Sequence, residues 1–557
     1  MSLKFHRLAI AGALIALAAS PALARDGARD SGRGGDESAG SSQGGGGKRV
    51  VVTPYIEAGQ VLSAELSPGS DSVTYSRIAA GVDALVQGRN TAAAVSLRYE
   101  RRIGWGDDAP HGDELTGIAR VSASVVPRTL TIEAGGLATR TRIESNGGAA
   151  SDPLGDDDQI GKIYSVYGGP SLSTHAGDVA VQANYRIGYT RVDEPDATLT
   201  TDGGEPVDVF DDSTVQVANV HLGTRPGQGL PVGLGVGAGW YREDMSNLDQ
   251  RIEDKHVRAD VTVPVSQSVA LVGGVGYEDV EISSRDALRD ETGAPVRGSD
   301  GRLVTDKSQP RRLAYDVDGL IWDVGVIWRP SVRTALEAHV GRRYGSTTYY
   351  GSFGWQTSRR SSVNVAVYDN VVGFGGNLNN ALTSLPTDFS AVRDALSGGI
   401  GNCVDSLESG NCFGNALGSV RSGTFRGRGV MASYAVNMGR TSAGIGAGYE
   451  RRKFIAAEDT VLAAANGVID ENWWLAAYLN NRLDQRSTIS ASAHVNWLDS
   501  GFDNSGKATA FGVNVAYDRV LAERLTATAA LGLDGINRSS DEDLLVASAL
   551  LGVRYSF

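Results

Sequence analysis

Alternation of apolar and polar residues is the main regularity along the chain. From residue 51 to the end, segments of roughly a dozen residues place an apolar side chain at every second position. One of them carries Val179, Val181, Ala183, Tyr185, Ile187 and Tyr189 on one face, and Gln182, Asn184, Arg186 and Thr190 on the other. A helix, with about 3.6 residues per turn, would scatter both sets around its axis. The pattern therefore predicts β-strands with one apolar and one polar face.

The number of these segments and the lengths of their connections predict an all-β fold. We count about 22 segments, with a range of about 20 to 24, which is within the range of single-chain bacterial barrels. Connections such as 126–129, 329–332 and 485–487 are short, whereas 192–212, 283–311 and 374–420 are long. Short turns on one side of the membrane and long loops on the other are typical of outer-membrane barrels. We therefore expect one large antiparallel transmembrane β-barrel.

The last segment of the chain ends in an aromatic pattern. Gly552, Tyr555 and Phe557 match Gly-x-x-aromatic-x-Phe, and this ending resembles the C-terminal assembly signal of bacterial outer-membrane β-barrels. The resemblance implies recognition by the barrel-assembly machinery. Val546 and Leu550 are apolar exceptions on the otherwise polar face of this segment. An ordinary edge strand that ends in Phe is the alternative interpretation.

The N-terminal residues predict export. Residues 1–24 have a positive start, a short apolar run and small residues near the end, as secretory signal peptides do. Residues 25–49 are rich in Gly and Ser, and too polar to bury a core, so we expect a disordered periplasmic leader. The predicted division is therefore a signal peptide, this leader, and a barrel over residues 50–557.

Charge and cysteine content narrow the possible partners. The formal net charge of −13 argues against a nucleic-acid partner. The expected partners are outer-membrane lipids and the barrel-assembly machinery, with polysaccharide or small solutes as candidate cargo. The two cysteines, Cys403 and Cys412, lie in the same long loop, and export favours their oxidation. We expect a disulfide between them rather than a reactive thiol.

The longest loop and several arginines are the candidate functional elements. A loop as long as 374–420 either folds into the lumen as a gate or covers the surface as a cap, and the sequence leaves both open. The candidates for basic side chains that face the lumen are Arg186, Arg342 or Arg343, and Arg554, and they would favour anions or acidic sugars. Alternatively, they pair with acidic residues of the wall, such as Glu337.

Other motifs have simpler structural interpretations. The alternate glycines of 233–239 and 444–448 lie inside strand patterns with no helix after them, so they predict close packing or lumen space rather than a phosphate loop. The acidic run 156–158 does not have the spacing of an EF-hand loop. Trp473, Trp474 and Trp497 are expected at the membrane interface. We expect no cofactor, no metal site and no catalytic activity.

Several segments carry a family resemblance. They are 52–60, 98–102, 164–170, 328–334 and 342–345. With the C-terminal pattern, they resemble a sphingomonad-type outer-membrane β-barrel family that is similar to barrels associated with exopolysaccharide production and PEP-CTERM sorting. Relatives sometimes carry the name of a preprotein-translocase accessory subunit, but this chain lacks the inner-membrane helix which that name implies. The resemblance implies an outer-membrane location and a link to surface polysaccharide.

Two functions from different classes follow from these observations. The first is a porin-like channel or an exopolysaccharide export pore, with a lumen constricted by the loop 374–420. The second is a non-conducting surface scaffold or adhesin that acts through its acidic extracellular loops.

Overall fold

The structure is a computed structural model, and the residues that it describes begin at Arg49. They run to Phe557, with gaps at 107–108, 144–148, 151–159, 194–197, 201–205, 209–211, 228, 299–301, 409–411, 503–505 and 540–541. The predicted signal peptide, nearly all of the predicted leader and the acidic run 156–158 lie outside the described residues. No helix in the described part is long and apolar enough to span a membrane.

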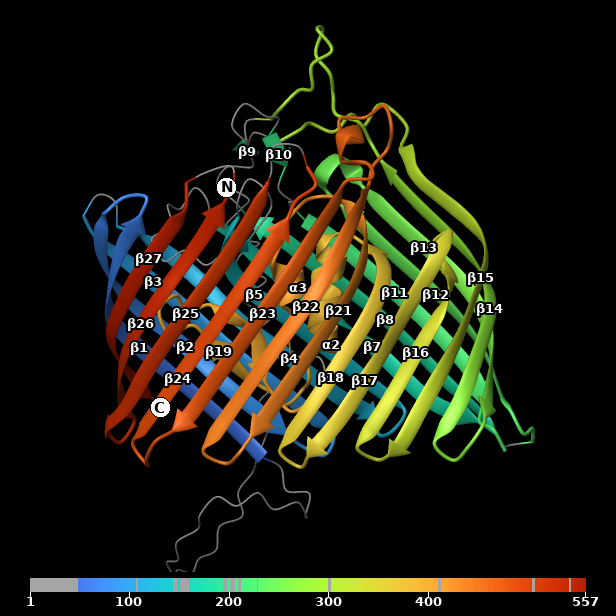
Figure 1. Ribbon diagram of the computed structural model, residues 1–557, viewed down its shortest axis with the longest axis horizontal. Coiled ribbons are helices and arrows are strands. Elements are labelled where there is room, and N and C mark those ends of the chain that lie inside the picture. The colour runs from blue at the N-terminus through green and yellow to red at the C-terminus, as the bar shows by residue number, and fades with distance from the viewer. Residues whose placement is uncertain are drawn as a thin grey trace, which may run out of the picture.

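Twenty-two antiparallel strands form a closed ring (Figure 1). They are β1 (Arg49–Ser67), β2 (Ser72–Gln87), β3 (Thr91–Trp105), β4 (Gly112–Val126), β5 (Leu130–Ile143), β7 (Ile160–Ala176), β8 (Val179–Asp193), β11 (Asp212–Thr224), β12 (Gly233–Met245), β13 (Arg251–Pro264), β14 (Val269–Ser284), β15 (Arg312–Ser331), β16 (Thr334–Arg343), β17 (Ser346–Ser358), β18 (Ser361–Val372), β21 (Thr424–Asn437), β22 (Thr441–Ile455), β23 (Ile469–Arg482), β24 (Ser487–Asp499), β25 (Lys507–Ala522), β26 (Leu525–Arg538) and β27 (Leu544–Ser556). Each strand pairs with its neighbours in chain order, and β27 pairs with β1 to close the ring. The predicted fold class and strand number are confirmed.

The remaining elements are short. They are β6 (Ala149–Ala150), β9 (Thr198–Thr200), β10 (Pro206–Asp208), β19 (Ser390–Arg393), β20 (Ile400–Asp405), α2 (Phe374–Ser384), α3 (Gly414–Leu417), η2 (Asn247–Asp249) and η3 (Ala463–Ala465). Short turns join the strands at the lower end of the barrel in Figure 1, and the long loops lie at the upper end. By the usual asymmetry of such barrels, the lower end is periplasmic and the upper end extracellular.

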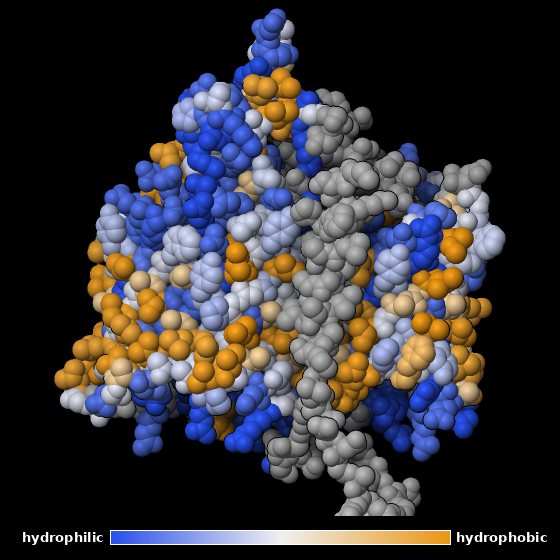
Figure 2. All heavy atoms as spheres, turned by 180° about the vertical axis from the view of Figure 1, so that it is seen from behind, coloured by the Kyte–Doolittle hydropathy of each residue, from blue (hydrophilic) through white to orange (hydrophobic). Residues whose placement is uncertain are grey.

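The outer face of the ring is apolar, as a lipid-facing wall must be. Exposed apolar side chains include Ile78, Val236, Leu320, Ile445, Leu531 and Leu551. On the face seen in Figure 2, hydrophobic residues gather in a band across the lower half of the barrel, with hydrophilic residues above and below it. In a closed ring, the backbone N–H and C=O groups of every strand have hydrogen-bond partners on both sides. A sheet needs this in order to cross a lipid bilayer.

The predicted loop 374–420 lies inside the barrel. We call residues 373–423 the internal segment; it leaves β18, forms α2, the β19–β20 hairpin and α3, and returns to the wall at β21 (Figure 1). Its elements contact strands on several sides of the ring, among them β8, β11, β3 and β23. The segment therefore crosses the lumen and does not cap the surface.

Two of the predicted side-chain directions are wrong, because neighbouring residues of a strand point to opposite faces. On β16, His339, Gly341 and Arg343 face the lumen, so Arg342 lies on the outer face with the exposed Val340. On β23, Trp473 is exposed on the outer face, whereas Trp474 is buried inside the barrel and is not at the membrane interface.

Candidate functional site

The first anchor of the internal segment is the N-terminus of α2. The Glu243 carboxylate on β12 accepts hydrogen bonds from the backbone N–H of Gly373 at 2.7 Å and of Gly376 at 2.8 Å. The Tyr241 hydroxyl donates to the same carboxylate at 2.6 Å. A helix N-terminus has unpaired N–H groups and a partial positive charge, so a buried carboxylate is a fitting partner. This anchor attaches α2 to the wall at β12.

The rest of α2 lies along the wall formed by β7 and β8. The Asn379 amide donates to Ser165 Oγ at 3.2 Å and to Thr190 Oγ1 at 3.3 Å. Arg186 on β8 donates to Thr383 Oγ1 at 2.8 Å and to Asn380 Oδ1 at 2.7 Å. Arg186 therefore faces the lumen, where it holds the helix.

The second anchor is the turn of the β19–β20 hairpin, residues 394–399, which we call the hairpin tip. Its carbonyl groups accept hydrogen bonds from the wall: Leu396 from Arg77 Nη1 at 2.8 Å, Ser397 from Arg102 Nη2 at 3.2 Å, and Gly398 from Thr116 Oγ1 at 3.2 Å. The Leu396 side chain is 2 % exposed and packs against an apolar patch of the wall. That patch consists of Val61, Tyr75, Ala516, Ala530 and Leu550. Leu550, an apolar exception on the polar face of its strand, is therefore part of the patch on which the hairpin tip docks.

Beside the hairpin tip lies a ladder of buried ion pairs. Glu100 accepts from Arg98 at 2.6 Å and from Arg102 at 2.9 Å, and Arg102 also pairs with Glu114 at 2.8 Å. Arg98 pairs with Glu57 as well. All of these side chains except Glu57 are almost fully buried, and buried charges persist only when they are paired. The ladder makes this side of the lumen rigid and polar without a large net charge.

Arg393 joins the hairpin to the same wall. Its guanidinium donates to Ser96 Oγ at 3.1 Å, to the Ser96 carbonyl at 3.0 Å and to Thr116 Oγ1 at 3.0 Å. Burial lowers the pKa of this guanidinium from its usual value. The side chain therefore contributes directed hydrogen bonds between the hairpin and strands β3 and β4.

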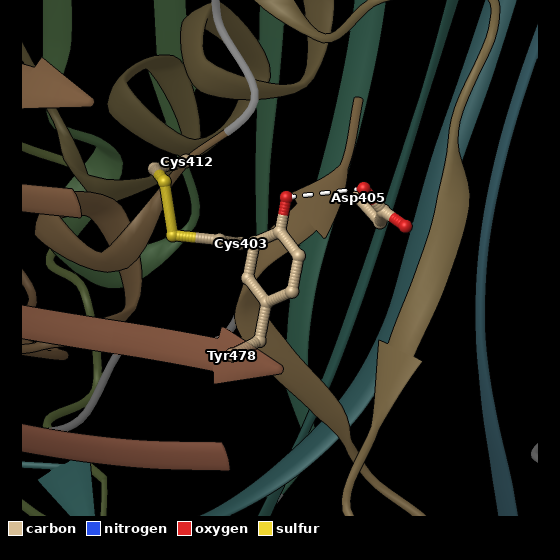
Figure 3. Close-up of a disulfide and its surroundings, with 4 residues drawn as sticks. All are labelled: Cys403, Asp405, Cys412 and Tyr478. Carbon is tan, nitrogen blue, oxygen red and sulfur yellow. Dashed lines mark hydrogen bonds between the residues drawn. A yellow bond between two sulfur atoms is a disulfide. The ribbon is translucent and has the colours of Figure 1, made fainter. Parts of the chain in front are cut away.

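The third anchor contains the disulfide between Cys403 and Cys412 (Figure 3). The disulfide packs with Trp474 and Tyr478 of β23, and the Tyr478 hydroxyl donates to Asp405 Oδ1 at 3.2 Å. Alternate glycines of β22 make room for this group. A Cβ atom at Gly446 would lie 2.6 Å from Cys412 Sγ, and one at Gly448 would overlap the Trp474 ring.

Past the disulfide, backbone groups attach the segment to β22 and β24. The Asn496 amide donates to the Gly418 carbonyl at 2.8 Å, and Arg452 Nη1 donates to the Ser419 carbonyl at 3.0 Å. Both donors are buried. The internal segment is thus held by polar contacts at three separated parts of the ring.

Polar cavities remain inside the barrel. One of about 470 Å³ is lined by residues that include Asp83, Ser96, Arg393, Asn514 and Arg554. A cavity of about 180 Å³ lies close by, and the two share Arg393 and Arg554. Another, of about 480 Å³, lies against β11–β13. No group of three or more His, Cys, Asp or Glu residues among the described residues is arranged to hold a metal ion.

The predicted arginines lie in different surroundings. Arg343 faces the lumen and pairs with Asp254 at 2.7 Å and Glu278 at 3.2 Å. Arg554 also faces the lumen and pairs with Asp83 at 2.9 Å. These two therefore pair with acidic residues of the wall, as the alternative interpretation expected, although Glu337 is not their partner.

The C-terminal residues lie where the ring closes. Tyr555 and Phe557 are exposed on the outer face with their ring centroids 5.2 Å apart, and Gly552 lies opposite Gly59 of β1. Recognition by the assembly machinery stays a prediction.

Sequence reasoning missed the hairpin tip and the ion-pair ladder. One signal for the ladder is the spacing of Arg98, Glu100 and Arg102, because charged residues at every second position must share one face of a strand. The signal for the docking patch is Leu550, an apolar residue on an otherwise polar face. The hairpin tip itself has no such local signal.

Comparisons with known proteins concern the barrel as a whole. No protein-family model and no curated protein matches the sequence. The ferric-catecholate import receptor Fiu from E. coli K12 has a TM-score of 0.45 at 10 % identity, with 90 % of this chain and 82 % of that chain covered. The FrpB iron transporter from Neisseria meningitidis (F3-3 variant) has a TM-score of 0.43 at 12 % identity, with 91 % of this chain and 81 % of that chain covered. The siderophore receptor PiuA from Acinetobacter baumannii has a TM-score of 0.43 at 8 % identity, with 90 % of this chain and 82 % of that chain covered.

These TM-scores all lie below 0.5, so the assignment rests on the barrel itself. The resemblance to a sphingomonad exopolysaccharide-associated family stays a prediction. The closed ring of strands and its apolar outer band make the chain an outer-membrane β-barrel with an internal segment across its lumen.

Proposed function

We propose that this protein is a constricted channel through which small polar solutes diffuse across the outer membrane. The observation that carries the proposal is a pair of large polar cavities, one of about 470 Å³ beside the internal segment and one of about 480 Å³ against β11–β13. A barrel of this strand number encloses more space than wall side chains fill. The internal segment fills part of that space, and both cavities are lined by hydrogen-bonding groups suited to water and polar solutes.

The charges that face the lumen support weak ion selectivity. Arg343 and Arg554 are each paired with carboxylates, and the ladder of Arg98, Glu100 and Arg102 contains both signs. Paired charges create little net field along a pore, whereas a ring of one sign would select the opposite ion. We therefore expect similar permeability to small cations and anions.

Single-channel recording in a planar bilayer tests the proposal. The purified protein, shown to be folded by its heat-modifiable migration, should give stable conductance steps. Absence of conductance from the folded barrel would contradict the proposed channel. It would favour the alternative, a non-conducting surface scaffold or adhesin that acts through the extracellular loops.

The proposed cargo is any small polar solute that the constriction admits. A link to exopolysaccharide rests on the resemblance alone, and none of the lumen contacts described above is specific for a polymer. Outer-membrane lipids and the assembly machinery remain the predicted partners of the outer face and of the C-terminal strand.

A further inference from the structure

The cavity against β11–β13 is bordered on β12 by Gly237, which carries no side chain. The inward positions of β12 are the alternate glycines of Gly233–Gly239, which we call the glycine trough. A Cβ atom at Gly235 would lie 2.6 Å from Asp260 Oδ2 and 2.7 Å from His221 Nε2. Side chains of β11 and β13 thus lean over the trough, and only glycine leaves room for them. The cavity beside them measures about 480 Å³.

The charged groups at the edge of the glycine trough compensate one another. Asp260 Oδ1 lies 3.1 Å from His221 Nε2 and accepts a hydrogen bond from Arg258 Nη1 at 3.2 Å. Arg258 also donates to Asp323 Oδ1 at 2.8 Å. Since Asp260 and Asp323 both already accept hydrogen bonds from Arg258, a charged solute would have to displace these contacts in order to bind. The edge of the trough therefore favours neutral solutes.

Amide side chains supply the free hydrogen-bonding capacity. Gln182, Asn184 and Asn219 line the cavity and are exposed to it, and within the described part of the chain their side chains make no hydrogen bond. Each amide offers both donors and an acceptor. A hydroxyl group also donates and accepts, so a solute rich in hydroxyl groups can use every one of these amides.

We infer that the glycine trough is a binding site for a neutral, hydroxyl-rich solute, namely a sugar of one or two rings. The cavity volume lies within the usual range for small-ligand sites, roughly 300–1,000 Å³. Gly237 has no side chain that would project into the cavity, and the amides reach the hydroxyl groups of a sugar that occupies it. The inference deepens the proposed function and rests on it for the route by which the sugar reaches the site.

Calorimetric titration of the detergent-solubilised protein with maltose tests the site without relying on conductance. Wild-type protein should bind maltose, and Gly237→Val, which places a side chain in the cavity, should bind at least roughly tenfold more weakly. The control is Gly273→Val, the same substitution on the outer face of β14, where the nearest atom to a new Cβ is 3.8 Å away. This control should bind as the wild type does.

A second variant distinguishes a loss of binding from a failure to fold. Asn219→Leu removes one amide at nearly constant volume and should also weaken binding, with heat-modifiable migration unchanged. Absence of binding to the wild type, or equal binding by Gly237→Val and wild type, would overturn the site. A barrel that conducts ions but does not bind maltose would overturn the site alone, and a barrel that binds maltose but never conducts would overturn the channel alone.

Discussion

Two strands of the wall carry the same pattern of alternate glycines, and the structure uses them differently. On β22, Gly444, Gly446 and Gly448 lie beneath Tyr478, the disulfide and Trp474, so the space that they leave is filled. On β12, His221 and His256 lie over Gly235 and Gly239, but Gly237 borders an open cavity. The same local pattern therefore produces a docking surface in one place and free space in the other.

The difference between the two glycine runs lies in what covers them. The internal segment reaches β22 through the disulfide and α3, whereas it contacts β12 mainly above the trough, through Glu243 and the N-terminus of α2. A glycine run thus indicates that something must fit closely against the wall. Which partner fits there depends on residues far away in the sequence.

The largest expected effect comes from the hairpin tip. Leu396→Ala should reduce the free energy of unfolding by about 3 kcal/mol, because a fully buried leucine leaves a cavity against the apolar patch. Urea unfolding in lipid vesicles measures it. The control is Leu531→Ala on the lipid-facing side of β26, and equal small losses in both variants would contradict docking of the tip.

Removing the disulfide should have the next largest effect. We expect the double variant Cys403→Ser, Cys412→Ser to have a free energy of unfolding about 2–3 kcal/mol lower than the wild type. Without the disulfide, the chain gains conformational freedom in the unfolded state. The internal segment should also become more accessible to added protease. Wild-type protein treated with a reductant serves as the matched comparison, and unchanged stability and cleavage in both would contradict the anchoring role of the disulfide.

A valine on the covered glycine run should have a moderate effect. Gly446→Val should reduce the free energy of unfolding by about 2 kcal/mol, because its Cβ would lie 2.6 Å from Cys412 Sγ and 3.1 Å from the Trp474 ring. Urea unfolding again measures the loss. Ala447→Val, the next position on the outer face of the same strand, is the control and should be nearly neutral. If both variants unfold alike, the disulfide does not pack on β22.

The same substitution in the open trough should have the smallest effect on stability. Gly237→Val should reduce the free energy of unfolding by about 1 kcal/mol, less than Gly446→Val, because its Cβ would lie 3.3 Å from the His221 ring and from the Val220 carbonyl oxygen. Measured beside Gly446→Val, it compares the two glycine runs directly. A loss as large as that of Gly446→Val would show that the trough is also covered.

The outer face of the barrel was predictable from the sequence because lipid is a uniform environment. Every second residue meets the same apolar surroundings, so alternation and connection lengths were enough to predict 22 strands and their direction. Arg342 was misplaced because it and Arg343 are adjacent and cannot both face the lumen. Trp474 was misplaced because interface aromatics were identified by residue type and not by register.

The inner face was less predictable because its neighbours come from distant parts of the chain. Leu550 faces a residue more than a hundred positions earlier, Leu396, and no local pattern specifies that contact. The ladder of Arg98, Glu100 and Arg102 is visible as alternating charges, but its burial depends on the hairpin tip above it. The long loop 374–420 was a candidate constriction, and only the assembled barrel distinguishes a lumen-crossing segment from a surface cap.

The central claim is that the internal segment narrows a polar passage through the barrel. The most direct test compares the single-channel conductance of the wild type with that of a variant in which residues 386–411 are replaced by a short Gly-Ser linker. We predict stable steps for the wild type and a conductance several-fold larger for the variant. Equal conductance from the two folded proteins would place the internal segment outside the passage and contradict the account.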